Sequence, residues 1–239
     1  MEKLTKKERK ELKKQENLQK LEKEQKQKTY KKIAFWIVGI VILGLIIWGV
    51  AAVVSAPKDE SSNTVSPITS ADVATGSATA KANLIEYADF ECPACAEYSK
   101  FVEQLRTDYP KDLRVAYRFF PLPQHQYGML TAQVAYAAAK QSKFWEMYKL
   151  LYDNQASWAA SPNAQGIFDD YAKQLNLNLT KFHNDENADS TKNLINNSYN
   201  QGINIGINST PTFYLNGNVI SPTNFNDFKS LVQNEINKK

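Results

Sequence analysis

The 239-residue sequence predicts an α/β fold with a helical block inserted in its middle, and three observations carry this prediction. Strand-like patterns occur at residues 83–88, 113–119 and 212–220. Between the second and third of these, residues 126–200 show helical periodicity. A Cys-x-x-Cys pair directly follows the first strand, where a helix is expected to begin. One apolar segment near the N-terminus predicts a single transmembrane helix ahead of this domain.

The basic charge of the chain is concentrated in its first 32 residues. They hold thirteen Lys or Arg and six Glu, whereas the remainder holds sixteen Lys or Arg and nineteen Asp or Glu. The formal net charge of +4 is therefore no indication of nucleic-acid binding. Residues 1–32 are rich in Lys, Glu, Gln and Leu, which predicts a solvated, partly helical cytoplasmic tail. Attraction to anionic lipid head groups is an alternative that is compatible with this interpretation.

Residues 33–54 contain no charged side chain and predict the transmembrane helix. At a rise of about 1.5 Å per residue they span roughly 33 Å, enough to cross the hydrocarbon core. Trp36 and Trp48 lie towards the two ends, where aromatic rings favour the interface. The preceding basic tail predicts a cytoplasmic N-terminus and an extracytoplasmic C-terminal domain. A cleaved signal peptide is the alternative, but the apolar run and the tail are both long for one.

Residues 55–82 are rich in Ser, Thr, Ala and Asp and lack apolar periodicity, which predicts a flexible linker. The folded domain is expected over residues 83–239. The linker would let this domain reach partners near the membrane surface while it stays anchored.

Within this domain the elements follow one another clearly. A strand at 83–88 leads into a helix at 93–109, and a second strand at 113–119 ends before two prolines. Four helices are expected in the insertion, at 126–141, 143–154, 166–175 and 190–202.

The C-terminal part of the domain predicts a hairpin followed by a helix. Residues 212–215 and 219–220 predict strands, and Asn216-Gly217 between them is a strong two-residue turn signal. A last helix is expected at 224–237.

The two cysteines, Cys92 and Cys95, are the only ones in the chain. Their spacing places them one helical turn apart, with Cα atoms about 5–6 Å from each other, which suits a disulfide. Pro93 is well accepted in a first helical turn, so Cys92 falls at the N-cap. Free backbone N–H groups and the helix dipole stabilise a thiolate there. We therefore expect an exposed, acidified Cys92, a more buried Cys95 and a reversible dithiol–disulfide pair.

Two structural roles for this pair are alternatives. A zinc site needs two further ligands, and the only histidines, His125 and His183, are far apart in sequence. A purely structural disulfide across so short a loop would remove little chain entropy. Redox chemistry is favoured over both.

Four separate stretches resemble the DsbA-like branch of the thioredoxin superfamily, over essentially all of residues 82–239. The resemblance implies a thioredoxin-like fold with a helical insertion at about 125–205, and protein thiol–disulfide oxidoreductase activity with no cofactor or metal. The stretches are Phe-Glu-Cys-Pro-Ala-Cys at 90–95, Phe-Pro-Leu-Pro-Gln-His at 120–125, Phe-Trp-Glu-Met at 144–147, and Ser-Thr-Pro-Thr-Phe at 209–213 with Asn-Gly at 216–217.

The resemblance also implies roles for individual residues. Pro211 matches the family's cis-proline, which would hold the backbone of Thr210 beside the Cys92 sulfur to pair with a bound substrate strand. Taken alone, this proline predicts an ordinary trans bond at a strand start. Glu86 matches the family's buried carboxylate, a candidate proton acceptor for Cys95, because burial raises a carboxyl pKa. A surface position for Glu86 is the alternative.

Three further residues affect the chemistry expected of the motif. Ala94 stands where the best-known family member has a histidine, so a donor beside the thiolate is absent and we expect an intermediate oxidising pair. Glu91 would oppose thiolate formation unless it pointed to solvent, so we expect it to be exposed. For His125 a structural or rim-lining role is favoured over a catalytic one.

These patterns predict a membrane-anchored, extracytoplasmic oxidoreductase that oxidises exported proteins with free thiols. Cys92, Cys95, Glu86 and Pro211 would form its catalytic site, and Thr210 and Pro93 would contact substrate. With no further cysteine for an internal relay, a separate redox partner must recycle the pair. The alternatives are a reductase or isomerase of exported thiols, and a non-catalytic scaffold or adhesion domain.

Overall fold

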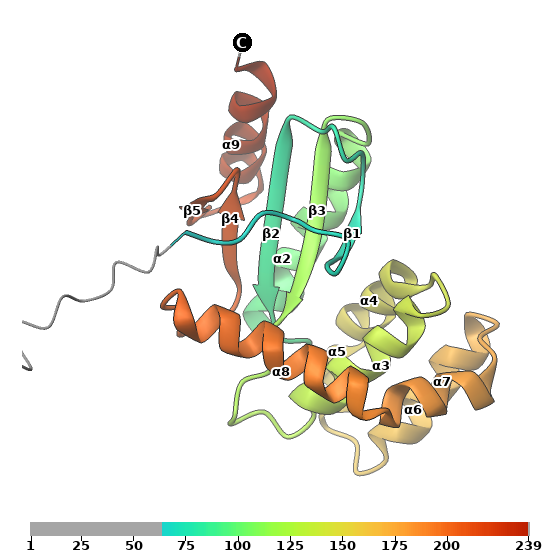
Figure 1. Ribbon diagram of the computed structural model, residues 1–239. Helices are drawn as coiled ribbons and strands as arrows, with labels where there is room; N and C mark the ends of the chain where they lie inside the picture. Colours follow the sequence, from blue (N-terminus) through green and yellow to red (C-terminus); the bar gives the residue numbers. More distant parts are fainter. Residues whose placement is uncertain (1–63, 239) are drawn as a thin grey trace, which may run out of the picture. The chain divides into compact units, whose positions relative to one another are not determined.

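A mixed β-sheet lies at the centre of the computed structural model, which describes residues 64–238 (Figure 1). Its strand order is β1-β3-β2-β4-β5. The neighbours β2 and β3 are parallel, and each of the other pairs is antiparallel. The strands are β1 (Val73–Thr75), β2 (Ala82–Ala88), β3 (Leu113–Phe119), β4 (Thr212–Leu215) and β5 (Asn218–Ile220).

The two faces of the sheet are covered by different parts of the chain. Helices α2 (Pro93–Asp108) and α9 (Phe225–Asn237) pack on one face, where Leu84 and Val115 are fully buried. On the opposite face, Ile85 and Tyr87 pack with residues from the ends of the helical insertion. Covering both faces explains why every residue of β2 and β3 except the second of each strand is buried, instead of burial alternating along the strand.

The helical insertion lies between β3 and β4 in sequence and gathers beyond the C-terminal ends of β2 and β3 (Figure 1). Helix α8 crosses the sheet face opposite α2, close against Phe120. Gly202 permits this approach, because a Cβ atom there would lie 2.6 Å from the Phe120 ring. The helices are α3 (Gly128–Ala139), α4 (Phe144–Asp153), α5 (Gln155–Ala159), α6 (Ala164–Gln174), α7 (Leu179–Asn187) and α8 (Asp189–Asn204).

The elements predicted within residues 83–239 occur at their expected positions to within two residues. In the hairpin turn, Asn216 and Gly217 have φ values of 47° and 85°, the left-handed conformation that this turn requires. Helices α5 and α7 were not predicted, since α5 is barely more than one turn long and α7 is short and polar.

The linker predicted over residues 55–82 is wrong for its C-terminal part. Residues 73–75 form β1, which pairs with β3 at the edge of the sheet, and Val65 is buried against the face that carries Ile85. The folded unit therefore begins before residue 83. Three strand residues and one isolated valine leave no periodic pattern in a segment of otherwise polar composition, which explains the error.

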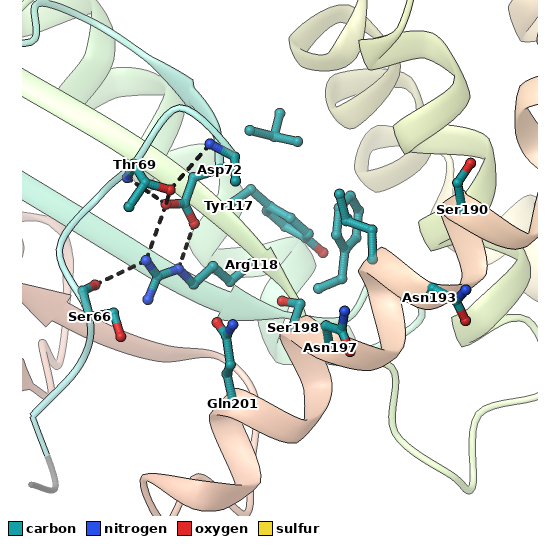
Figure 2. A pocket seen from close by; sticks show the side chains of 14 residues that line it. Ser66, Thr69, Asp72, Tyr117, Arg118, Ser190, Asn193, Asn197, Ser198 and Gln201 are labelled. Atoms are coloured by element: carbon teal, nitrogen blue, oxygen red, sulfur yellow. Dashed lines mark hydrogen bonds and ion pairs between the residues drawn. The ribbon is translucent and has the colours of Figure 1, made fainter.

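A buried ion pair between Arg118 and Asp72 fixes the segment ahead of β2 to the sheet (Figure 2). Nε of Arg118 donates to Oδ1 of Asp72 at 2.7 Å, and its Nη2 donates to the carbonyl of Ser66 at 3.0 Å. Arg118 is only 4% exposed, so these acceptors, rather than water, stabilise its positive charge. Figure 2 also shows polar side chains of α8, including Ser198 and Gln201, on the far side of the pocket from Asp72.

The predicted tail at 1–32 and membrane helix at 33–54 lie outside the residues that the structure describes. Within residues 64–238, no helix has both the length and the apolar character needed to cross a bilayer.

Candidate active site

Cys92 occupies the N-cap of α2, immediately after β2 and its short connecting loop. Its backbone is extended, with φ −74° and ψ 121°, and Pro93 follows as the first helical residue. The predicted local geometry is thus confirmed. The sulfur lies where the first N–H groups of the helix are free to stabilise negative charge.

In this reduced form of the pair, the pKa values of the two thiols are shifted in opposite directions. A hydrogen bond with the Cys95 thiol is the largest cause that lowers the pKa of Cys92, to about 5, and the backbone N–H groups of Ala94 and Cys95 and a hydrogen bond with Thr210 add to it. Cys95 is fully buried, and burial raises its pKa well above the ordinary value. The Cys92 thiolate and the Cys95 thiol are therefore the stable protonation states at neutral pH.

The peptide bond between Thr210 and Pro211 is cis, as the resemblance implied. The loop places the carbonyl oxygen of Thr210 3.4 Å from the Cys92 sulfur. Cys92 is only 7% exposed, so the prediction of an exposed nucleophile is wrong in degree. The neighbouring Pro93 and Ala94 are exposed, which leaves an open surface around a sulfur that is itself mostly covered.

Glu86 lies on β2 with its carboxyl group completely buried. The surface alternative for this residue is wrong. Its Oε2 accepts a hydrogen bond from the Tyr148 hydroxyl at 3.3 Å, while Oε1 has no hydrogen-bond partner among residues 64–238. Burial raises the pKa of Glu86 to about 8, and the charge of Glu86 in turn raises the pKa of Cys95. A carboxyl group with this pKa is suited to exchange protons with a thiol near neutral pH.

A second acidic residue, Asp89, organises the loop between β2 and Cys92. It is 2% exposed, and its carboxylate accepts hydrogen bonds from the backbone N–H groups of Glu91 and Leu122. His125 lies against the same carboxylate, in agreement with the structural role favoured for it. The expectation that Glu91 points to solvent is wrong, because its carboxylate accepts from the N–H of Tyr127 and is partly buried.

Three contributors to the site were missed from sequence: Asp89, Tyr148 and Gln155. The side-chain amide of Gln155 donates to the carbonyls of Phe90 at 2.7 Å and Cys92 at 2.9 Å, which ties α5 to the active-site loop. Asp89 stands three residues before Cys92, so its position could have drawn attention to it. Tyr148 and Gln155 carry no such signal, since both reach the site only through the packing of the helical insertion.

The sequence pattern of the family described as Thioredoxin matches residues 69–234. The chain belongs to the thioredoxin family. The match begins before residue 83, in agreement with the ordered segment ahead of β2.

Solved structures share the architecture of this thioredoxin-family domain. Oxidised BdbD from Bacillus subtilis is 20% identical with a TM-score of 0.62, covering 73% of this chain and 98% of that protein. Wolbachia pipientis α-DsbA1 is 20% identical with a TM-score of 0.64 (71% and 93%). The catalytic domain of Proteus mirabilis ScsC is 18% identical with a TM-score of 0.60 (71% and 92%). The predicted thioredoxin-like fold with a helical insertion is confirmed, and membership of the thioredoxin family agrees with the predicted resemblance.

Curated relatives match only with part of their length. The Na(+)/H(+) antiporter NhaA 3 of Salinispora tropica is 33% identical over 139 residues, which cover 58% of this chain and 20% of the antiporter. NhaA 1 of Mycolicibacterium gilvum is 29% identical over 179 residues, 73% of this chain and 28% of that protein. The chain thus spans between a fifth and three tenths of these relatives, and the antiporter name describes much longer proteins.

Proposed function

We propose that the protein is an extracytoplasmic, membrane-anchored oxidoreductase that introduces disulfides into exported proteins through Cys92 and Cys95. The observation that carries this proposal is the unequal acidity of the two thiols. A stable Cys92 thiolate stabilises the reduced pair, and a pair whose reduced form is stabilised is a stronger oxidant. The low pKa also makes Cys92 a good leaving group at the end of the reaction.

The catalytic cycle follows from these two acidities. A substrate thiolate attacks the Cys92 sulfur of the oxidised pair, the Cys92–Cys95 bond breaks, and Cys95 leaves with the electron pair. Glu86, protonated at neutral pH, supplies the proton that converts Cys95 to a thiol. A second substrate thiolate then attacks the substrate sulfur of the mixed disulfide and expels the Cys92 thiolate. The substrate gains a disulfide and the protein is left reduced.

The surface next to Cys92 supports binding of an extended substrate segment. The backbone of Thr210 lies beside the sulfur in the loop before β4, so it is positioned to pair with a strand that presents a cysteine to Cys92. Pro93 forms an exposed part of the same surface. Backbone pairing depends little on side chains, which suits an enzyme that acts on many unfolded clients.

The protein is anchored in the membrane by its N-terminal segment, and its cysteine pair is re-oxidised by a separate partner. The charge-free segment at 33–54 and the basic tail before it support a single membrane helix with the catalytic domain outside the cytoplasm. Disulfides persist in that environment. A separate membrane or extracytoplasmic oxidant accepts the electrons that the reduced pair carries.

The test is oxidation of a dithiol peptide by the purified protein, together with the equilibrium potential of Cys92–Cys95 against glutathione. We expect stoichiometric peptide oxidation by the wild type and none by Cys92→Ser. We also expect a potential more oxidising than about −270 mV, the value of thioredoxin. Peptide oxidation by Cys92→Ser at the wild-type rate would overturn the assignment. Alkylation trapping in cells separates the rival role: a mostly reduced pair would indicate a reductase or isomerase.

A further inference from the structure

A four-residue turn at residues 89–92 carries the nucleophile from the end of β2 to the start of α2. The N–H of Cys92 donates to the carbonyl of Asp89 at 3.1 Å and closes the turn. The central peptide group of the turn joins Phe90 to Glu91, and its N–H donates to Oδ1 of Asp89 at 2.8 Å. Its carbonyl oxygen belongs to the buried Phe90, so this oxygen needs a donor from another part of the chain.

Gln155, the first residue of α5, supplies that donor. Its Nε2 donates to the carbonyl of Phe90 at 2.7 Å and to the carbonyl of Cys92 at 2.9 Å. Both acceptors are carbonyl oxygens, so only the NH2 end of the amide suits this position. Within residues 64–238 no other donor reaches the Phe90 carbonyl. The orientation of the central peptide group therefore depends on one side chain of the helical insertion as well as on Asp89.

Helix α5 is short, but its position is fixed from within the insertion. Trp158, which follows Gln155 by three residues, is fully buried and packs edge-on against Phe168 with ring centroids 5.5 Å apart. Its indole N–H donates to the carbonyl of Leu151, on α4, at 2.7 Å. A large aromatic side chain thus anchors the backbone that carries Gln155, and the amide is held in place to bond the turn.

The position of the turn decides where the Cys92 sulfur lies. The N–H groups of the first turn of α2 stabilise the sulfur from one part of the chain, and Thr210 does so from the cis-proline loop. Both sets of contacts form together only if the Cys92 backbone is held in one place. The carbonyl of Cys92 accepts the first hydrogen bond of α2, from the N–H of Ala96 at 3.2 Å, and the Gln155 amide bonds the same oxygen. Loss of this amide would therefore loosen the residue that carries the sulfur.

We infer that Gln155 is a positioning residue for the nucleophile: its amide holds the turn at residues 89–92 so that the Cys92 sulfur stays over the free N–H groups at the start of α2. The helical insertion thus contributes to the chemistry of a cysteine pair that the sheet and α2 carry. The inference rests on the proposed function, because thiol–disulfide exchange depends on a well-placed Cys92. Gln155 acts through the backbone of the turn, and it has no proton to exchange near neutral pH.

The first test is Gln155→Met, which keeps the approximate length of the side chain and removes both donated hydrogen bonds. The midpoint of the Cys92 titration is followed in the reduced protein by the ultraviolet absorbance of the thiolate. We expect it to rise by about half a pH unit, because the sulfur is held less firmly over the N–H groups of α2. The equilibrium constant for oxidation of glutathione by the pair should fall about threefold, since the reduced form loses stability.

Gln155→Ala is a second variant, and it keeps the inference testable if a methionine at this partly exposed position disturbs folding. Neither substitution adds or removes a charge. A shift of the Cys92 midpoint therefore reports a changed position of the sulfur rather than a changed local charge. The ionisable side chains around the turn are the same in both variants and in the wild type: Asp89, Glu91, Cys95, His125 and Tyr152.

Gln141→Met is the matched control. Gln141 also uses its amide to hold backbone groups of the insertion: its Nε2 donates to the carbonyl of Asn178 at 3.2 Å, and its Oε1 accepts from the N–H of Asn178 at 2.9 Å. Asn178 belongs to neither the turn nor the cis-proline loop. The control should lower the thermal stability of the protein at an unchanged Cys92 midpoint, whereas both Gln155 variants should move that midpoint.

Wild-type values of the Cys92 midpoint and of the glutathione equilibrium in Gln155→Met and Gln155→Ala would overturn the inference, even if both proteins were less stable. An equal shift in Gln141→Met would also count against it, because a general loosening of the insertion would then be the cause. The titration needs no substrate. Its failure is therefore distinguishable from a wild type that does not oxidise peptides, which would contradict the proposed function.

Discussion

Nδ1 of His125 lies 2.7 Å from Oδ2 of Asp89, a carboxylate that is almost completely buried. The same oxygen accepts from the N–H of Leu122 at 2.7 Å, and the other accepts from the N–H of Glu91 at 2.8 Å. One side chain thus joins the active-site loop to the segment that leads into α3. Gly128 allows this packing, since a Cβ atom there would lie 2.9 Å from Oδ2.

We predict that Asp89→Asn lowers the free energy of unfolding by about 2 kcal/mol, because one of the acceptor oxygens becomes an NH2 group facing buried donors. Urea unfolding at pH 7 measures this. His125→Ala removes one of the side chains that contact the Asp89 carboxylate, and it should lower the free energy of unfolding by less than Asp89→Asn does. An Asp89→Asn protein as stable as the wild type would show that the loop does not depend on this carboxylate.

The Cys92 thiol should titrate with a midpoint near pH 5 in the reduced protein, as followed by thiolate absorbance at 240 nm. Its folded pKa lies below the unfolded one, so its contribution to stability is fully present above about pH 9 and is lost as the pH falls through about 5. Cys95→Ala should raise the midpoint, because the Cys95 hydrogen bond is the largest cause of the shift. Cys92→Ser should show no step in this range, and an unchanged midpoint in Cys95→Ala would contradict the account.

Glu86 should make the reduced protein less stable as the pH rises. Its folded pKa is raised to about 8 from 4.5, so its contribution to stability is complete below pH 4.5 and is lost as the pH rises through 8. Relative to Glu86→Gln, the wild type should lose about 1.4 kcal/mol of unfolding free energy per pH unit across this window. Denaturant titrations at several pH values measure the difference, and parallel stability curves for the two proteins would indicate that Glu86 is ionised at neutral pH.

Asp72→Asn should cost about 3 kcal/mol of unfolding free energy, since it leaves the buried guanidinium of Arg118 without its counter-ion. Glu97→Gln, which breaks the exposed pair with Lys100, is the matched control and should cost less than about 1 kcal/mol. Thermal unfolding of both variants compares them. Equal, small losses would mean that the segment before β1 is held by apolar contacts alone.

Most elements of residues 83–238 and the local geometry of the reactive pair could be predicted from the sequence, whereas β1, α5 and α7 could not. Strand and helix periodicities, the Asn216-Gly217 turn and the N-cap position of Cys92 depend on residues close together in the chain, and their positions agree with the structure. Pro93 after Cys92 was enough to place the sulfur at the helix terminus.

Which distant residues complete the site depends on how the helical insertion packs against the sheet. Tyr148 reaches Glu86 from 62 positions away, and Gln155 reaches the Cys92 carbonyl from 63 positions away, through helices that pack in the insertion. The segment ahead of β2 belongs to the fold because Arg118, on β3, needs Asp72 as its counter-ion. Periodicity reports which face of an element is buried, but not which partner covers it, and burial against a particular partner sets the acidity of Glu86 and Cys95.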